Sequence, residues 1–414
     1  MNIGLVSENL KNLSESRSYL IAYSGGVDSH VLLHALVVLR QQDPDIQLRA
    51  VHVHHGLSDY ADAWQLHCQK VCAQLQVPFV TEKVMLNLSK ESVEAAARDA
   101  RYQIFAKYLQ PHECLLTAHS KDDQAETLLL QLLRGAGPAG LSAMPFKKEF
   151  SQSWHLRPLL DVTREAIERY AQEQQLHWVE DDSNENLRFD RNYLRHQVMP
   201  LLKARWPAVV NNLSRAASHA ASAQTMLSLL ADNDLKVLVG SKKNTLSIAA
   251  LCALNPLRRA SALRYWLQTL GCRVPSTKQL AQIEKDVLMS AEGAMPVFYL
   301  EKGELRRYRD DLYYTELAEF DQQLKIHWDC CSTLDLPQSL GKLLPGDYKD
   351  YQALTVCFRQ GGEVIKPAGS NFTQSLKKLF QQWGVPPWER DRIPLLYDGD
   401  RLVAVHRYCV SSPE

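Results

Sequence analysis

The chain has 414 residues, 45% of them hydrophobic, and its 47 basic and 47 acidic side chains give a formal net charge of zero. This length predicts two or three folded domains, and the balanced charge argues against a general polyanion-binding protein. The nine scattered cysteines suit a reducing compartment, and no stretch resembles a signal peptide or a membrane span. We therefore expect a cytoplasmic protein that does not enter a membrane.

Predicted strands and helices alternate over residues 1–215. Strands are expected at 19–23, 47–55, 77–84, 114–118 and 155–160. Helices are expected within 1–17 and at 30–39, 62–75, 92–109, 122–134 and 164–174. This alternation predicts an α/β domain, a parallel, doubly wound, Rossmann-like sheet with helices on both faces. Ligands of such sheets bind beyond the carboxyl ends of the strands.

The pattern changes beyond residue 215. Helices are expected at 211–230, 256–270 and 276–289, and a hairpin at 297–314, so residues 216–320 are predicted to form a mostly helical domain. Short apolar runs and one helix near 374–383 predict a small α+β domain over 321–414.

The stretch Ser24-Gly25-Gly26-Val27-Asp28-Ser29 joins the first predicted strand to the following helix. Its glycines allow a tight turn, and N–H groups at the start of a helix bind phosphate. The serine hydroxyls can donate to the same oxygens, and Asp28 can hold Mg²⁺ against them. The alternative, a glycine-rich turn capped by Asp28, is disfavoured by two serines and an aspartate at this spacing.

Two other segments carry charged residues near the same predicted edge of the sheet. Asp123 and Glu126 share a helical face and can bind a cation or an amine, although the helix dipole alone also explains acids at this position. Glu94 and Arg98 have the spacing of an exposed ion pair, and Arg101 is placed to reach a phosphate.

Histidines and segregated charge complete the candidate features. Alternation sends His52 and His54 to one face of a strand and His55 to the other, which argues against a zinc site. Residues 161–186 hold eight acids and two bases, whereas 187–215 hold six bases and one acid. The second segment is a local basic stripe that can contact phosphate.

Taken together, these motifs resemble those of the tRNA(Ile)-lysidine synthase family, which belongs to the PP-loop ATP pyrophosphatases. The resemblance rests on SGGVDS at 24–29, HVHHGLS at 52–58, AAARDARY at 95–102, TAHSKDDQAET at 117–127, RGAGPAGLSAM at 134–144, EDDSN at 180–184, RFDRNYLR at 188–195, Pro367, KKLF at 377–380 and VPPWERDR at 385–392. One departure is Ser58, where the family usually has arginine.

The resemblance implies a two-step ligation. ATP adenylates C2 of the wobble cytidine in the isoleucine tRNA with a CAU anticodon, and free L-lysine then displaces AMP to form lysidine. The implied cofactors are ATP and Mg²⁺, with residues 24–29 around the pyrophosphate. The implied catalytic residues are Asp28 (also the metal ligand), Arg98 or Arg101 at the α-phosphate, Asp123 and Glu126 at the lysine amine, and Arg191 and Arg195 at the adenylate or the anticodon loop.

The two later domains are expected to contact the tRNA. Lys377, Lys378, Arg390 and Arg392 lie in sequence among three aromatic residues, a mixture that suits tRNA contact or an ordinary solvated face equally well. The oligomeric state is open between a monomer and a homodimer.

Three alternatives remain. A PP-loop thiolation enzyme needs cysteines near its site, and no Cys-x-x-Cys pair follows the loop. A small-molecule amide ligase needs an ammonia source, and the chain has no N-terminal cysteine glutaminase. The third alternative is a non-catalytic module that binds ATP and RNA.

Overall fold

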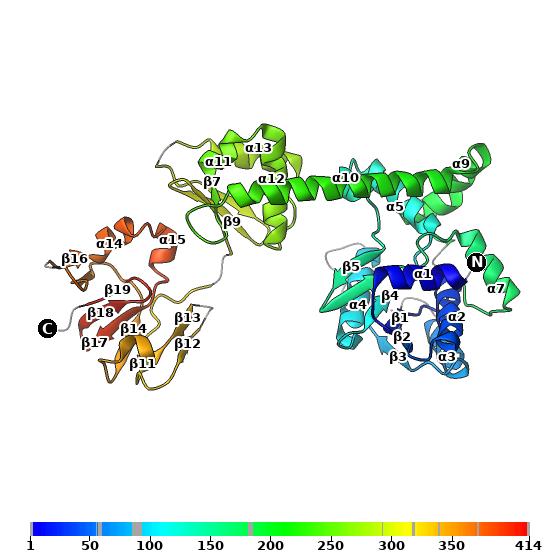
Figure 1. Cartoon of the computed structure of the whole chain (residues 1–414), viewed down its shortest axis with the longest axis horizontal. Coiled ribbons are helices and arrows are strands. Elements are labelled where there is room, and N and C mark those ends of the chain that lie inside the picture. The colour runs from blue at the N-terminus through cyan, green and yellow to red at the C-terminus, as the bar shows by residue number, and fades with distance from the viewer. Residues whose placement is uncertain are drawn as a thin grey trace. The chain divides into compact units, whose positions relative to one another are not determined.

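The computed structural model describes residues 3–54, 56, 60–84, 93–180, 185–291, 293–316, 319–337, 340–370 and 372–411, without the side chains of residues 5 and 93–95. The expectations for His55, Ser58, the Glu94 side chain and residues 181–184 lie outside this range. The chain divides into two compact units, Met1–Leu227 and Ser228–Glu414 (Figure 1). In the described part of the chain, no helix is long and apolar enough to cross a membrane.

A six-stranded sheet forms the centre of the first unit, in the order β3-β2-β1-β4-β6-β5. Its strands are β1 (Ser18–Ala22), β2 (Gln47–His54), β3 (Phe79–Lys83), β4 (Cys114–Leu116), β5 (Lys147–Phe150) and β6 (Ser153–Leu156). Neighbouring strands are parallel except β5 and β6. The predicted parallel α/β sheet is confirmed. The edge strand β5 was not predicted, because Lys147, Lys148 and Glu149 interrupt any apolar run.

Helices cover both faces of this sheet, as predicted. The helices of this part of the chain are α1 (Ile3–Leu13), α2 (Val27–Gln42), α3 (Ala61–Gln74), α4 (Val93–Tyr108), α5 (Lys121–Leu133), α6 (Pro138–Leu141) and α7 (Arg164–Glu173). Along β1, Tyr19 and Ile21 join the core formed with α2 and α3, whereas Leu20 packs with Phe105 of α4. Figure 1 shows α2 and α3 on one side of the sheet and α4 on the other.

The direction of strand addition reverses at β1. The sheet grows through β2 and β3 on one side of β1, and through β4 and β6 on the other. The loops that follow β1 and β4 therefore leave the same edge of the sheet and flank a topological switch point, where ligands of open α/β sheets bind.

The last part of the first unit packs against α5. It contains α8 (Asp190–Tyr193), the π-helical turn η2 (Leu194–Val198), α9 (Met199–Arg205) and the start of α10 (Val209–Val237). Because Pro200 has no N–H to donate, the regular α-helical ladder is interrupted at this point, and η2 directly precedes it. Met199 and Val210 share a small core with Ala125 of α5.

The second unit begins with a mixed helical and β core. Its elements are α11 (Ile248–Ala253), α12 (Pro256–Thr269), α13 (Thr277–Ile283), the π-helical turn η3 (Glu284–Leu288) and a sheet in the order β7-β10-β9-β8. The strands are β7 (Leu246–Ser247), β8 (Val297–Leu300), β9 (Gly303–Tyr308) and β10 (Asp311–Thr315). The predicted hairpin is therefore part of a four-stranded antiparallel sheet that packs on the helices.

The remainder of this unit is α+β, as predicted. Its main sheet has the order β11-β14-β17-β18-β19. The elements are β11 (Ile326–Trp328), β12 (Leu334–Leu336), β13 (Gly341–Leu343), the 3₁₀ turn η4 (Pro345–Tyr348), β14 (Leu354–Cys357), β15 (Val364–Ile365), β16 (Gln374–Ser375), α14 (Leu376–Gln382), α15 (Pro387–Arg390), β17 (Leu395–Asp398), β18 (Arg401–Val405) and β19 (Cys409–Val410). Domain boundaries at 215 and 320 stay predictions.

Candidate active site

The loop after β1 is held by its own serines. The Ser24 and Ser29 hydroxyl oxygens are 3.0 Å apart, and Ser29 Oγ also donates to the carbonyl oxygen of Gly26 at 3.0 Å. Gly25 has a φ of +90°, and a Cβ on it would lie 2.9 Å from both Cys68 Sγ and Val179 Cγ2. Only glycine fits this turn.

The helix α2 starts at Val27, so that Asp28 and Ser29 lie in its first turn. Its N-cap residue is Gly26, and no side chain caps the helix. The alternative of a turn capped by Asp28 is therefore wrong. The N–H groups of the first turn and the positive end of the helix dipole remain available to an anion.

Asp28 has one oxygen without a partner. Its Oδ1 is buried and makes no hydrogen bond to the part of the chain that the structure describes, and its Oδ2 lies 3.9 Å from Nη1 of Arg164. Burial raises the pKa of Asp28 to about 6, although the Arg164 charge opposes that shift. A buried carboxylate oxygen beside a phosphate-binding loop fits the oxygen ligands that Mg²⁺ takes.

The carboxylates of Asp123 and Glu126 bind one guanidinium. Arg195 donates to Glu126 from Nε at 2.7 Å and from Nη2 at 2.8 Å, and Nη2 also donates to Asp123 Oδ1 at 2.9 Å. The two carboxylates are only 14% and 3% exposed. The structure thus places Arg195 on the carboxylate pair, whereas the sequence analysis assigned it to the adenylate or the anticodon loop.

The pKa values of the two carboxylates are driven apart. Burial opposes ionisation of Asp123, but His119, which is protonated at the acid pH where Asp123 titrates, together with Arg191 and Arg195 outweighs it and lowers the pKa of Asp123. Burial raises the pKa of Glu126 despite its contacts with Arg195. Neighbouring groups with divergent pKa values can divide the roles of charged anchor and proton acceptor.

Asp123 also has a local structural role. Its Oδ2 accepts hydrogen bonds from the backbone N and the hydroxyl of Ser120 at 2.8 and 2.9 Å, which completes a capping box at the start of α5. Asp123 therefore caps the start of α5 with Oδ2 and leaves Oδ1 to bind a cation, so the two interpretations of this residue are compatible.

Arg191 and Arg98 both act on His119, in the loop that follows β4. Arg191 donates from Nη2 to Thr127 Oγ1 at 2.8 Å, and its Nε lies 3.4 Å from Glu126. Arg98 is exposed on α4, with its guanidinium 5.7 Å from the Tyr102 ring centre. Burial lowers the pKa of His119 to about 4, and the charges of Arg191 and Arg98 contribute to that shift. Both cations therefore act on the end of β4.

Arg101 acts on β2. Burial lowers the pKa of His52, and the Arg101 charge adds to this effect. His52 Nδ1 lies 3.0 Å from the carbonyl oxygen of Tyr23, while His54 Nε2 lies 2.9 Å from Asp62 Oδ1. The two histidines have separate partners, and within the described residues no group of three or more His, Cys, Asp or Glu side chains could hold a metal ion.

Comparison with known proteins identifies the family. Residues 4–202 match a PP-loop domain, 246–313 a TilS substrate binding domain, and 354–413 a TilS substrate C-terminal domain. The chain is 47% identical to tRNA(Ile)-lysidine synthase of Coxiella burnetii over 411 residues, 97% of this chain and 91% of the relative. The chain belongs to the tRNA(Ile)-lysidine synthase family. Its relative from Serratia proteamaculans is 43% identical, over 98% of this chain and 94% of the relative.

Arg164 is a residue of the candidate site that the sequence analysis missed. Its Nε donates to Glu168 at 2.9 Å, and its Nη1 approaches Asp28. The spacing of Arg164 and Glu168 indicates only an exposed helical ion pair, so no local pattern reveals the contact with Asp28. Thr117, His155 and Arg157, which pack behind His119, were missed for the same reason.

Only some of the basic and aromatic residues predicted to form a tRNA-binding surface in the last domain are exposed. Lys377 and Lys378 are exposed on α14, but Phe380 is fully buried. Trp383 stacks on Tyr408 with ring centres 5.2 Å apart. Arg390 donates to the carbonyl oxygen of Val385 at 2.9 Å and to Tyr308 Oη at 3.4 Å. Trp388 contacts Tyr313, with the two ring centres 5.4 Å apart. The two lysines are thus the more accessible part of this surface.

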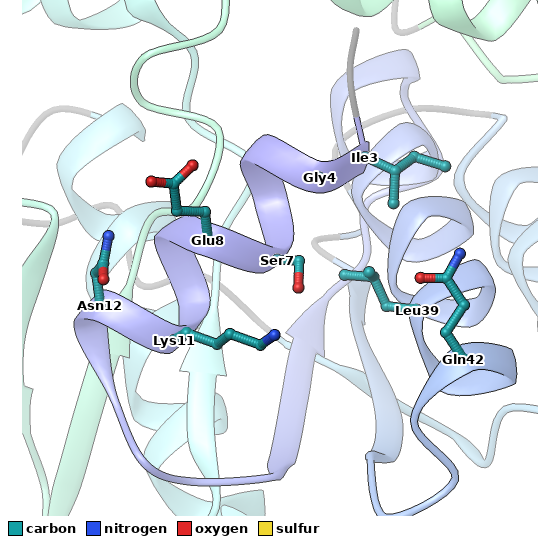
Figure 2. Close-up of a pocket in the computed structure, with 8 residues that line it drawn as sticks. All are labelled: Ile3, Gly4, Ser7, Glu8, Lys11, Asn12, Leu39 and Gln42. Carbon is teal, nitrogen blue, oxygen red and sulfur yellow. The ribbon is translucent and has the colours of Figure 1, made fainter.

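A hollow of about 490 Å³ lies between α1 and α2, away from the candidate active site (Figure 2). Ser7 and Lys11 approach it from α1, and Leu39 and Gln42 from the last turns of α2. At 1.5 Å of rise per residue, Leu39 is about 15 Å along α2 from Ser29. The hollow is therefore separate from the phosphate loop.

Proposed function

We propose that this protein ligates L-lysine to C2 of the wobble cytidine of the isoleucine tRNA with a CAU anticodon, using ATP. The observation that carries the proposal is the position of two sites at one switch point. An uncapped helix start with Asp28 follows β1, and a carboxylate pair with divergent pKa values follows β4. One can take the phosphates and the other an amine.

In the first step, O2 of the cytidine attacks the α-phosphorus of ATP, and pyrophosphate leaves. The N–H groups at the start of α2 and the hydroxyls of Ser24 and Ser29 would hold the leaving phosphates. Asp28 would hold Mg²⁺, which neutralises charge on the leaving group when bound. Arg98 or Arg101 would stabilise the charge on the α-phosphate as it transfers.

In the second step, the lysine amine attacks C2 and AMP leaves. Free lysine carries an ammonium group with a pKa of about 10.4, so a proton must be removed before attack. Asp123, whose pKa is lowered, stays ionised and would anchor the amine. Glu126, whose pKa is raised, is the better proton acceptor of the two and would take the proton.

In the absence of lysine, Arg195 would hold the carboxylates of Asp123 and Glu126 in place. Two buried carboxylates side by side repel each other, and the guanidinium, paired with both, offsets this repulsion. An arriving ammonium can compete for the same oxygens. Arg191, held by Thr127 beside Glu126, would then meet the adenylate.

The second unit would bind the body of the tRNA, with Lys377 and Lys378 as phosphate contacts. The relatives named above are called tRNA(Ile)-lysidine synthases, and the TilS domain matches cover both parts of this unit. The oligomeric state, monomer or homodimer, is a separate question that light scattering answers.

A thiolation function is less well supported. Sulfur transfer uses a thiolate, and burial raises the pKa of both Cys68 and Cys72 to about 12. These two thiols, which lie behind the phosphate loop, are therefore protonated at neutral pH.

Pyrophosphate release tests the proposal. The full chain with ATP, Mg²⁺ and the CAU-anticodon tRNA should release one pyrophosphate per tRNA in the absence of lysine, and should turn over only when lysine is added. Release that does not depend on tRNA would contradict the proposal, and so would no release at all, the result expected of a non-catalytic ATP- and RNA-binding module.

A further inference from the structure

Four side chains form a hydrogen-bonded chain from the protein interior to the candidate active site. Arg157 donates from Nη2 to His155 Nδ1 at 3.2 Å. His155 Nε2 lies 2.7 Å from Thr117 Oγ1, which in turn lies 2.8 Å from His119 Nδ1. Thr117, His155 and Arg157 are buried, whereas His119 is half-buried where the chain leaves β4.

Arg157 sets the direction of every hydrogen bond in this chain. A guanidinium can only donate, so His155 Nδ1 must accept and the ring carries its proton on Nε2. His155 then donates to Thr117 Oγ1. The Thr117 oxygen could accept a second hydrogen bond, but among the described residues His119 Nδ1 is its one remaining partner, so the hydroxyl proton is satisfied only by donating to that nitrogen. A neutral His119 therefore carries its proton on Nε2.

Both rings are neutral over the physiological range. Burial lowers the pKa of His155 to about 2, and the nearby Arg157 charge adds to the shift. Burial also lowers the pKa of His119 to about 4; the charge of Asp123 opposes this, and those of Arg157, Arg191 and Arg98 reinforce it. Each ring thus has one donor and one acceptor nitrogen, as the directed chain requires.

The Nε2 end of His119 is the free end of the chain. Among the described residues it has no hydrogen-bond partner, and the cations that act on the ring are Arg98 and Arg191 as well as Arg157. Two of these cations are the residues proposed above to meet the transferring phosphate. A neutral N–H donor among them suits an anionic oxygen.

We propose that Arg157, His155 and Thr117 are positioning residues that hold His119 as its Nε2–H tautomer, and that this N–H donates a hydrogen bond to a phosphate oxygen of the adenylated intermediate. This role rests on the proposed function. The tautomer itself does not, because it follows from contacts within the protein.

The tautomer is measured directly by nitrogen-15 NMR of the full chain labelled at histidine, with His119 assigned from the signal lost in His119→Gln. Wild type should show a protonated Nε2 and an unprotonated Nδ1. A proton on Nδ1 in wild type would overturn the proposal; the tautomer is read on the wild-type chain, and His119→Gln serves only to assign the signal. If the tautomer is as expected but the protein forms no lysidine, the proposed function fails and the tautomer assignment stands.

Thr117→Val and Thr117→Ser form a matched pair. Valine keeps the shape but removes the hydroxyl, and serine keeps the hydroxyl. Thr117→Val should give a mixture of His119 tautomers and lower kcat about fivefold, the effect of losing one neutral hydrogen bond worth about 1 kcal/mol, with KM for ATP unchanged. Thr117→Ser should keep both the tautomer and kcat. A Thr117→Val protein with a single Nε2–H tautomer, or a loss of kcat equal in both variants, would overturn the role of the chain.

Discussion

Glu126→Gln separates the two chemical steps. The substitution keeps the size of a side chain that is only 3% exposed and removes its charge and its ability to take a proton. In the proposed mechanism Glu126 acts only after the adenylate has formed. The first step should therefore keep its rate to within about threefold, while loss of a general base lowers lysine transfer by roughly 10²–10⁴-fold.

The same change also has a cost in stability. Arg195 loses a charged partner to which it donates at 2.7 and 2.8 Å, and keeps Asp123 at 2.9 Å. Truncating one partner of a buried, hydrogen-bonded charge pair costs about 2–5 kcal/mol, and the retained Asp123 places this case near the lower end. Thermal unfolding of the variant checks that it remains folded under the assay conditions.

The assay is a single-turnover experiment with ATP and tRNA in which pyrophosphate release and lysidine formation are followed separately. Glu165→Gln is the control, since Glu165 pairs with Arg169 at 2.7 Å on an exposed helical surface and should change neither rate. If Glu126→Gln loses pyrophosphate release while an adenylated tRNA supplied to it still accepts lysine at the normal rate, the carboxylate serves the first step and the assignment is wrong.

Four further predictions test other parts of the account. Asp28→Ala should abolish pyrophosphate release while the far-ultraviolet circular dichroism spectrum is unchanged, and a wild-type rate would remove its metal role. Gly25→Ala should weaken ATP binding and lower the melting temperature, because its φ is +90° and a Cβ would meet side chains at 2.9 Å; an unchanged ATP affinity would contradict the tight-turn argument. Burial, reinforced by neighbouring histidines, lowers the pKa of His30 to about 4, so the unfolded chain binds more protons than the folded chain below about pH 6.5. The free energy of unfolding should therefore fall by up to about 3 kcal/mol as the pH is lowered toward 4. Urea titrations at several pH values should show a smaller fall in His30→Asn. Lys377→Ala should lower the salt slope of tRNA binding by about one unit, whereas an unchanged slope would assign Lys377 to an ordinary solvated surface.

Local motifs account for the parts of the site that could be predicted from sequence. The phosphate loop depends on residues 24–29 in a fixed order between a strand and a helix, and Asp123 and Glu126 share a face because they are three residues apart. The parallel sheet followed from the alternation of apolar strands and helices. The edge strand β5 was not predicted, because an exposed edge tolerates charged residues that hide the apolar pattern of a strand.

Contacts between distant segments account for what could not be predicted. Arg195 reaches Glu126 across 69 positions of sequence, and Thr117 meets His155 across 38. Nothing in the basic stripe distinguishes an arginine that binds carboxylates from one that binds nucleic acid. The direction of a hydrogen-bonded chain likewise becomes readable only when Arg157 is seen beside His155.

Mass spectrometry of the modified nucleoside tests the central claim most directly. A CAU-anticodon isoleucine tRNA is incubated with the protein, ATP, Mg²⁺ and isotope-labelled L-lysine, then digested to nucleosides. The account predicts that the wobble cytidine gains the mass of one labelled lysine less one water, and that the gain requires ATP. An unmodified cytidine, or a nucleoside whose added mass carries sulfur and no label, would contradict it.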